Sequence, residues 1–554
     1  MSVVLPQPKP QWIARMYPPT GGQDHLGIGS VSSDRILPTL SPSINVLTVH
    51  PRYHSFYVFL LDEFWRRDLP RSRASWVQFF RPREFVLSLG SHFCDRLEHG
   101  DMPRAVGSQK TAALAARKYP EYDTTTDYIK NDLGGYGLYY RSVMAEVGLI
   151  YPGGPGLPYE VDVPSEHGKV VAAAFREAVQ STDYYREFFD KDVCLIPTRV
   201  IQTYIRQACL CQLQATTAPD RRFLLDVFLH HGVAADSRRQ TFRLLLDIAA
   251  QSNSAPLSDD AFRQVLYFQA ADSGITYTPS EAVVETLRLW RLFQAREYYA
   301  FALNAMFYHL CRWGLDERGD LRPLSLSSFW EHIDQALDLG PLAKQLNVPD
   351  PAIGGTSSVT DLMHWLERLC DTGTEEFDAA CRLDVPIHEH RLYNLAMMPP
   401  TDASTLVGGM VTMLALLFLR FSTVDRWHTG EWRISHMGAD GRLSVDEFIR
   451  AFRQRVDNRA TLHDLTRWLF EDYIIVQHQL VANSKMPWNN TFRFHREGDR
   501  LRFFHLENGL GFSDSRFNAL STTIHELGLC ADLRQDDHPL TPDGQRLLSE
   551  GDLQ

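Results

Sequence analysis

The chain has no excess of positive charge, no CxxC cysteine pair and no apolar run long enough to cross a membrane. Its 56 lysines and arginines are outnumbered by 68 aspartates and glutamates, which excludes a basic field over the whole molecule. The eight cysteines are scattered along 554 residues, as is typical of reduced thiols in the cytoplasm. The start of the chain has no charged segment followed by a long apolar one, so we expect no secretion signal.

The most apolar stretch, residues 406–419, is shorter than the roughly 20 residues that a membrane-spanning helix needs. We therefore expect a buried core helix and no membrane contact. The sequence also lacks a phosphate-binding P-loop, a GxSxG nucleophile motif and an HExxH zinc motif. It predicts neither catalytic residues nor a cofactor. A metal-dependent nuclease built from scattered acids has no local pattern, and it stays open as an alternative.

The histidines and cysteines show no spacing that is known for metal ligands. His388 and His390 are too close along a helix to converge on one ion. Cys209 and Cys211 lie in an apolar helical stretch, where a buried structural cysteine is the usual interpretation. Cys94 has only nearby histidines in an unfamiliar spacing. We predict no metal site from these patterns.

The length and the helical patterning predict a mainly α, multi-domain fold. We expect an irregular arm with a helical domain over residues 1–150, a large helical domain over 160–430 and a C-terminal α+β domain over 431–554. The break between the first two is the Gly/Pro-rich stretch 151–158. In the second, Thr278 and Glu281 indicate a capping box that starts a long helix, which we expect to end at Gly314.

A β-hairpin is predicted over residues 491–505, where apolar and basic residues alternate about a Gly-containing turn. Alternation places one set of side chains on the solvent face, namely Arg493, His495, Arg500 and Arg502. A half-buried sheet with a solvated face explains this pattern, and a basic surface that contacts phosphates is the alternative.

The last forty residues hold a helix over 516–527, a stop at Gly528, a polar stretch over 531–539 and the segment Leu540–Leu548. This order resembles the third helix and wing of a winged-helix domain. The resemblance implies that Arg516, Asn518 and Arg534 contact DNA. However, residues 431–554 contain 15 basic and 19 acidic residues, whereas DNA-binding winged helices are usually basic. A role in protein contacts or architecture is the open alternative.

A second basic region lies near the N-terminus, with aromatic residues interleaved among its arginines. The basic residues are Arg66, Arg67, Arg71, Arg73, Arg81 and Arg83, with Asp68 as the only acid between them. Arginine with aromatics suits a nucleic-acid backbone and unstacked bases. It also suits an interface with an acidic protein, and the arginines could instead pair with acids of the same chain.

The general layout is similar to that of large helical accessory proteins of bacterial anti-phage and restriction systems. This resemblance implies a non-catalytic cytoplasmic subunit that engages or senses DNA within a multiprotein complex. Its partners would be DNA, through the local basic patches, and a motor or nuclease subunit. The alternative is a protein scaffold or adaptor without nucleic-acid contact.

Overall fold

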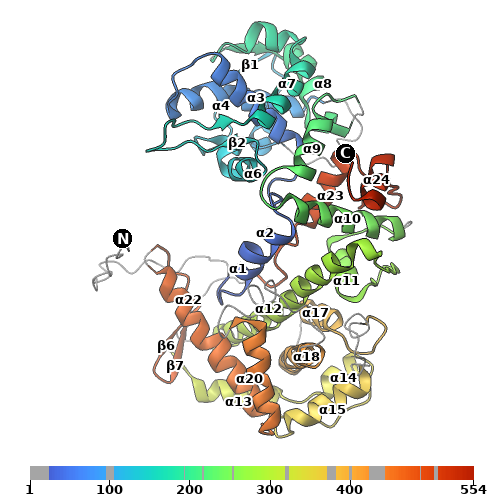
Figure 1. Cartoon of the computed structure of the whole chain (residues 1–554). Helices are drawn as coiled ribbons and strands as arrows, with labels where there is room; N and C mark the ends of the chain where they lie inside the picture. The colour runs from blue at the N-terminus through green and yellow to red at the C-terminus, as the bar shows by residue number, and fades with distance from the viewer. Residues whose placement is uncertain are drawn as a thin grey trace, which may run out of the picture. The chain divides into compact units, whose positions relative to one another are not determined.

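The computed structural model describes residues 24–94, 105–192, 194–214, 217–252, 255–317, 323–370, 382–398, 402–422, 443–486, 488–504 and 509–553. The described chain is mainly α-helical, which confirms the predicted fold class (Figure 1). It forms two compact units, each made of two stretches of sequence. Unit 1 comprises Met1–Ile36 and Arg291–Ser513, and unit 2 comprises Leu37–Trp290 and Asp514–Gln554.

This division differs from the three consecutive domains that the sequence predicts. The C-terminal forty residues belong to the same unit as the N-terminal helices. The Gly/Pro-rich stretch at 151–158 lies inside unit 2, because it connects β2 (Ile150–Tyr151) to its antiparallel partner β3 (Val163–Pro164). Glycine and proline mark a hairpin-like loop here, not a linker between domains.

Unit 1 is built around α18 (Ala403–Phe421), which contacts α13, α14, α15, α17 and α20. Figure 1 shows these helices surrounding α18. The other helices of this unit are α1 (Gly29–Val31), η1 (Ser32–Ile36), α13 (Leu326–Ala336), α14 (Gly340–Gln345), α15 (Val359–Leu369), α17 (Glu389–Met397), α20 (Val445–Asp457), α21 (Leu462–Trp468), η10 (Leu469–Val476) and α22 (Gln477–Lys485).

The central helix α18 is apolar nearly all round, as the sequence predicts for residues 406–419. By length and composition it could cross a membrane, but 89% of its most apolar window is buried inside the structure. A helix that is hydrophobic on every face is stable when other helices cover it completely. The burial of α18 therefore fits the core helix of a helical unit.

The long helix expected after residue 278 is α12 (Val284–Glu317), preceded by the short turn η6 (Glu281–Val283). Its residues before Arg291 belong to unit 2, and the rest belong to unit 1. The predicted capping box is wrong, because Ser280 is the residue that precedes the first turn. The predicted end at Gly314 is wrong as well. A Cβ at Gly314 would lie 2.3 Å from the Phe503 ring, so this glycine allows close packing within a continuing helix.

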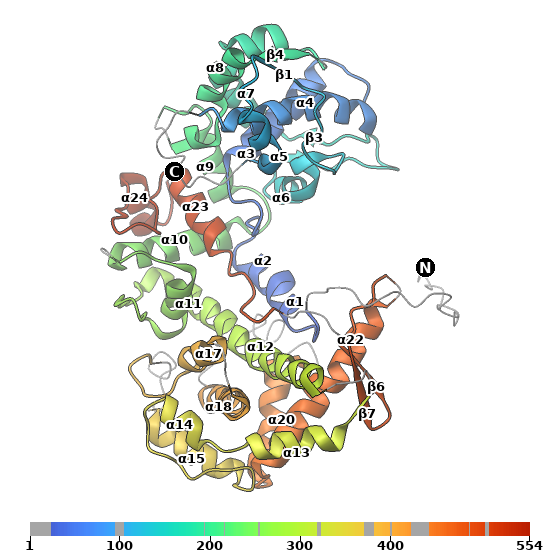
Figure 2. The ribbon, with the colours of Figure 1, turned by 180° about the vertical axis from the view of Figure 1, so that it is seen from behind.

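Unit 2 contains the N-terminal helices and the C-terminal segment. Its helix α3 (Arg52–Arg66) is buried along nearly its whole length and packs on α7 (Glu166–Val179), α4 (Arg73–Ser91) and α9 (Arg221–His230), as Figure 2 shows from behind. The remaining helices are α2 (Leu37–Leu40), α5 (Ser108–Ala115), η3 (Tyr136–Tyr140), α6 (Arg141–Glu146), η4 (Tyr184–Phe188), α8 (Thr198–Ala208), η5 (Leu210–Gln214), α10 (Ala235–Ser252), α11 (Asp259–Phe268), α23 (Phe517–Glu526) and α24 (Pro542–Glu550).

The sheets within the described ranges are small and antiparallel. In unit 2, β1 (Glu121–Asp123) pairs with β4 (Leu195–Pro197), and β2 pairs with β3 in a separate two-stranded sheet. In unit 1, β5 (Leu324–Ser325), β7 (Arg500–Phe503) and β6 (Phe494–Glu497) form a three-stranded sheet with β7 in the centre. The hairpin predicted over 491–505 is thus present as β6 and β7, and its turn contains Gly498.

Candidate partner-binding surface

Arg83, one of the six arginines between residues 66 and 83, lies inside unit 2. Its guanidinium carbon is 3.7 Å from the centre of the Phe79 ring and 4.8 Å from that of Phe189. The Arg83 guanidinium donates hydrogen bonds to the backbone carbonyls of both phenylalanines, and Nη1 is 3.3 Å from Asp192 Oδ1. Burial lowers the pKa of Arg83. Its side chain is 2% exposed, so this arginine holds α4 in place and cannot meet a polyanion.

Arg67 at the end of α3 is bound by two carboxylates. It pairs with the buried Glu63 one turn earlier and, at 2.7 Å, with Asp190 Oδ1. Glu63 also accepts a hydrogen bond from Arg176 of α7. Burial alone would raise the pKa of Glu63, but the hydrogen bonds from the two arginines outweigh it and lower this pKa. The Arg67 charge is therefore neutralised within unit 2.

Arg81 is also held by its own chain. Its Nη2 lies 3.1 Å from Asp127 Oδ1, and its guanidinium donates to the carbonyls of Ile129 and Asn131 at 2.9 and 3.0 Å. The guanidinium carbon lies 4.5 Å from the centre of the Tyr128 ring. Three of the six arginines thus serve internal contacts, which was the third possibility raised by the sequence.

The other three arginines of this region are exposed. Arg66 is 57% exposed and makes a distant contact of 3.8 Å with Glu63. Arg71 is 44% exposed, and its Nη2 lies 3.3 Å from the fully solvated Asp68. Arg73 is exposed, and within the described residues its guanidinium has no ion pair. Ion pairs between solvated side chains are weak, so these charges remain accessible.

Arg71 lies on two aromatic rings that come from distant parts of unit 2. Its guanidinium carbon is 4.6 Å from the centre of the Trp65 ring and 5.4 Å from that of Tyr159. The two rings meet edge to face at 5.0 Å. We call Trp65, Arg71, Arg73 and Tyr159 the Arg–aromatic surface. Sequence analysis missed Tyr159, because the loop that carries it looks like a domain boundary and no local signal places it near Trp65.

The buried carboxylate of Asp162 fixes the loop that carries Tyr159. It pairs with Arg141 (2.7 Å, Nε to Oδ2), and its Oδ1 accepts the Gly153 N–H at 2.6 Å. Tyr136 donates its hydroxyl to the same carboxylate. The hydrogen bond to Asp162 raises the pKa of Arg141, so the Arg141 guanidinium keeps its charge.

The backbone completes the support of the Arg–aromatic surface. The Asp162 carbonyl accepts the Trp65 indole N–H at 2.8 Å, and the Arg73 amide donates to Glu160 Oε2 at 3.1 Å. The Trp65 ring and the loop that carries Tyr159 are therefore held in position within unit 2. Preorganisation of this kind lowers the entropy cost of binding.

A small cavity adjoins this surface, and two exposed apolar side chains lie on the segment that carries Tyr159. Tyr151 at the end of β2 is 63% exposed, and Leu157 on the loop that follows is 54% exposed. A cavity of about 130 Å³ is lined by Arg73, Trp76 and Arg141, among others. Exposed apolar groups beside arginine and aromatic rings are typical of the energetic centres of protein interfaces.

The basic hairpin of unit 1 offers less charge than the sequence predicts. Arg493 is buried, which corrects its placement on the solvent face. It precedes β6, and its backbone N–H donates to His478 Nε2 at 3.0 Å. Arg502 is exposed but lies 2.6 Å from Glu497 across the turn. Arg500 is exposed and, in the ranges that the structure covers, has no ion pair.

The C-terminal segment contains a helix and a glycine stop where the sequence predicts them, and the segment after the polar stretch forms a second helix, α24. The first helix is α23, Gly528 has a φ of +75°, and an isolated bridge joins Cys530 to Leu540. However, α23 packs against α10, α11 and η5, and most of its side chains are buried.

The three predicted DNA contacts of this segment are largely engaged. Arg516 is buried, and its Nη1 donates to the Ser41 carbonyl at 3.1 Å, so its predicted contact with DNA is not accessible in this conformation. Arg534 is exposed, with its Nε 2.8 Å from Asp532 Oδ1. It also donates to the Oδ1 of Asn518 at 2.8 Å. Among these three side chains, only Arg534 offers an exposed basic group, and Asp532 binds it.

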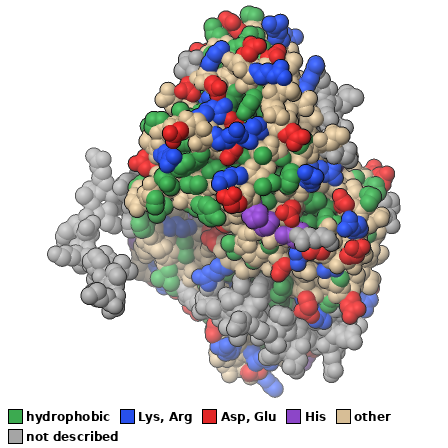
Figure 3. Space-filling model, turned by 45° about the horizontal axis from the view of Figure 1, so that its top comes forward, with side chains coloured by type: hydrophobic (Ala, Val, Ile, Leu, Met, Phe, Trp, Pro, Cys, Tyr) green, Lys and Arg blue, Asp and Glu red, His purple; other side chains and the backbone are tan. Residues whose placement is uncertain are grey.

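Comparison of the chain with protein-family models, curated proteins and solved structures finds no match. Figure 3 shows basic and acidic side chains interspersed across the face in view, without a continuous basic area.

Proposed function

We propose that this protein is a non-catalytic scaffold or adaptor that binds an acidic segment of a partner protein on the Arg–aromatic surface. The observation that carries the proposal is the stacking of the exposed Arg71 guanidinium on Trp65 and Tyr159. Tryptophan, tyrosine and arginine are the residue types most enriched among interface hot spots. Here they form one contact group, and the buried Asp162 supports it.

The chemistry of the surface defines the partner segment. Arg71 and Arg73 favour carboxylates, and a cation over an aromatic ring contributes about 0.5–1 kcal/mol at an exposed site. Tyr151 and Leu157, on the segment that carries Tyr159, expose apolar area, which favours at least one apolar side chain in the partner. An acidic peptide segment with an apolar anchor therefore fits better than a uniformly charged polymer.

The DNA-engaging function predicted from the sequence is the competing proposal, and it has less support. Arg67, Arg81 and Arg83 of the N-terminal region are bound internally, and Arg493 and Arg516 are buried. Affinity for DNA depends on the number of phosphates that basic groups neutralise. Few accessible charges remain to do so, and Asp68 and Glu160 lie close to them.

The test compares capture of host proteins by the full-length chain and by two charge-matched variants. The first is the double variant W65A/R71E. The control is R199E, because Arg199 is exposed on α8 of the same unit and in the described chain has no ion pair. After cross-linking in the native host, we expect one partner in stoichiometric amount with wild type and R199E. The cross-links should map to acidic partner peptides, and the double variant should lose the partner at least tenfold.

A second measurement separates the two proposals. Duplex and single-stranded DNA are titrated into the wild-type protein at about 50 mM salt, where binding driven by phosphates is strongest. We expect no binding in the micromolar range. Tight DNA binding that R71E abolishes would overturn the scaffold function in favour of the DNA-engaging one. Equal partner capture by all three proteins would overturn the assignment of the surface.

A further inference from the structure

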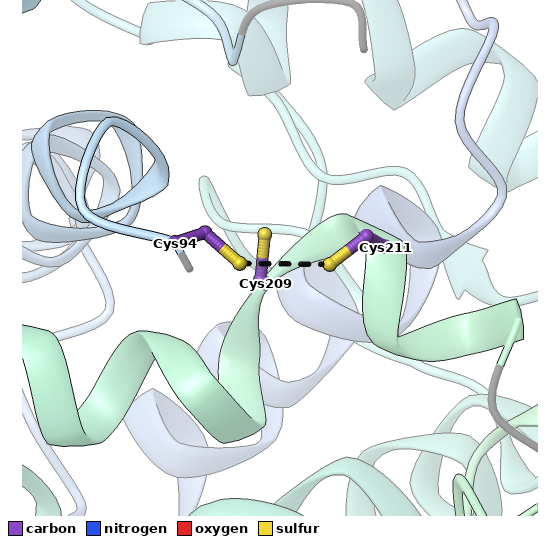
Figure 4. Close-up of side chains that lie close together, drawn as sticks. All are labelled: Cys94, Cys209 and Cys211. Atoms are coloured by element: carbon purple, nitrogen blue, oxygen red, sulfur yellow. Dashed lines mark hydrogen bonds between the residues drawn. The ribbon is translucent and has the colours of Figure 1, made fainter. Parts of the chain in front are cut away.

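Three cysteines from separate parts of unit 2 meet at one point. Cys94 follows the end of α4, Cys209 ends α8, and Cys211 lies in the next turn, η5. The three sulfur atoms all lie within 4.8 Å of one another. Figure 4 shows the Cys94 and Cys211 side chains pointing toward each other, with Cys209 between them. The structure thus joins a residue to a pair that is more than a hundred positions away in the sequence.

The sulfur separations fit ligands of one metal ion better than a disulfide. A disulfide bond is about 2.05 Å long, whereas the Sγ atoms of Cys94 and Cys211 are 3.7 Å apart. Zinc binds thiolate sulfur at about 2.3 Å in a tetrahedron, which places two sulfurs about 3.8 Å apart. The observed separation therefore matches one edge of a zinc–thiolate tetrahedron.

The backbone around the cluster is fixed by a buried ion pair. Arg52 of α3 donates from Nη1 to the Cys209 carbonyl at 2.5 Å, and its Nε is 3.2 Å from Asp220 Oδ2. The side chains of Arg52 and Asp220 are both at most 1% exposed. The turn that carries Cys209 and Cys211 is held rigidly, as a metal site requires. Cys209 and Cys211 are buried, and Cys94 is half-buried, which leaves an approach for an ion from the Cys94 side.

Thiols also cluster simply because cysteine packs well in apolar interiors. Packing alone, however, does not require three sulfurs from two distant segments to converge within the range of one ion. In the thiol form, hydrogen bonds to Cys209 and Cys94 raise the pKa of Cys211. The Cys211 thiol therefore keeps its proton without an ion, and an incoming cation must displace that proton.

We propose that Cys94, Cys209 and Cys211 bind a zinc ion through three thiolates. Thiolate sulfur selects soft and borderline ions over Mg²⁺ or Ca²⁺. Each thiol releases its proton to the solvent when its sulfur binds, and no electron is transferred. The fourth position of the tetrahedron is completed by a water molecule or another ligand. The ion would connect the end of α4 to the turn between α8 and η5 within unit 2.

The test measures zinc in the full-length protein, purified under reducing conditions without chelators. We expect about one zinc per chain by elemental mass spectrometry, and less than a tenth of this in C94S and C211S. The matched control is C530S, because Cys530 is also buried in unit 2 but lies outside the cluster. Cys94 is half-buried, so C94S is the variant least able to disturb the fold, and circular dichroism verifies this.

Direct ligation is tested by replacing zinc with Co²⁺ in the wild-type protein. We expect sulfur-to-cobalt charge-transfer absorption together with the intense visible bands of a tetrahedral site, and their loss in C94S. Zinc added to the metal-free protein should release about three protons per ion at neutral pH. The proposal is overturned if wild type and C94S hold equal zinc, if copper(I) alone is retained, or if mass spectrometry finds Cys94 and Cys211 in a disulfide.

Discussion

Two regions rich in arginine, the α3–α4 region of unit 2 and the β6–β7 hairpin of unit 1, look alike in sequence but differ in structure. In the first, the carboxylates that bind the arginines come from distant segments, such as Asp127, Asp190 and Asp192. In the second, Arg502 pairs with Glu497, five residues earlier. The α3–α4 pairs connect secondary structure elements, whereas the hairpin pair lies on the surface.

This difference shows that the number of arginines in a segment does not measure the positive charge of its surface. An arginine bound by a distant acid contributes to tertiary stability, and an arginine bound by a neighbour in water contributes little. The comparison predicts that substitutions will be costly in α3–α4 and nearly neutral on the exposed face of the hairpin.

The largest effect is expected for R83A in α4. The variant loses the packing of the guanidinium on Phe79 and Phe189 and removes one hydrogen-bond donor from each of two buried backbone carbonyls. We expect the free energy of unfolding to fall by about 2–4 kcal/mol, measured by urea denaturation. R73A is the control, because Arg73 is exposed in the same helix and its loss should cost under about 0.5 kcal/mol. Equal effects of R83A and R73A would remove the basis of the comparison.

The hairpin has its own buried anchor, which makes it sensitive to acid. His478 donates through Nδ1 to the His25 carbonyl at 3.2 Å and accepts the Arg493 N–H at Nε2. Burial, more than the charges of Arg493 and Lys485, lowers the pKa of His478 to about 3. The folded state thus resists protonation more than the unfolded chain does. The contribution of neutral His478 to the free energy of unfolding is fully present above the unfolded pKa near 6.5. This contribution is lost as the pH falls toward 3.

We therefore expect wild-type protein to lose roughly 2–3 kcal/mol through His478 between pH 7.5 and pH 4.5. The variant H478Q removes this titration, so its unfolding free energy should change less over the same range. H495Q is the control, because His495 is exposed on β6. The measurement is the denaturation midpoint at both pH values. If H478Q and wild type lose the same unfolding free energy between the two pH values, protonation of His478 is not the cause of the loss.

A moderate effect is expected for R67A at the end of α3. Glu63 keeps its bond from Arg176, so its buried charge is not left alone, and we expect a loss of about 1–2 kcal/mol. R66A is the matched variant, because Arg66 lies 3.8 Å from the same carboxylate but is 57% exposed. Thermal unfolding should show a clear decrease for R67A and almost none for R66A. A larger decrease for R66A than for R67A would mean that Arg66, and not Arg67, stabilises the buried Glu63 carboxylate.

The smallest effect is expected for R502A in the hairpin. Arg502 and Glu497 form their pair in solvent, and water replaces each partner easily when the other is removed. We expect an unchanged unfolding midpoint in moderate salt and no change in the structure of the sheet by hydrogen exchange. A marked loss of stability would show that the two regions hold their arginines in the same way.

The sequence predicted the elements well where a local pattern is sufficient. The buried helix α18, the long helix α12 and the β6–β7 hairpin all follow from periodicity and turn residues. The predictions failed where a residue has a distant neighbour. The local pattern indicates a helix end at Gly314. The reason for this glycine is its close contact with Phe503, which lies almost two hundred residues further along the chain. Arg493 was placed in solvent because alternation was extended one residue beyond the strand that begins at Phe494.

The candidate sites divide in the same way. The sequence by itself determined that arginines and aromatics occur together near residue 70, because composition is a local property. Only the tertiary structure decided that Tyr159 completes the stack on Arg71 and that Cys94 meets Cys209 and Cys211. Contacts of this kind depend on how helices pack, and packing is set by the burial of apolar surface from the whole unit. The spacing of residues along the chain therefore does not predict these contacts.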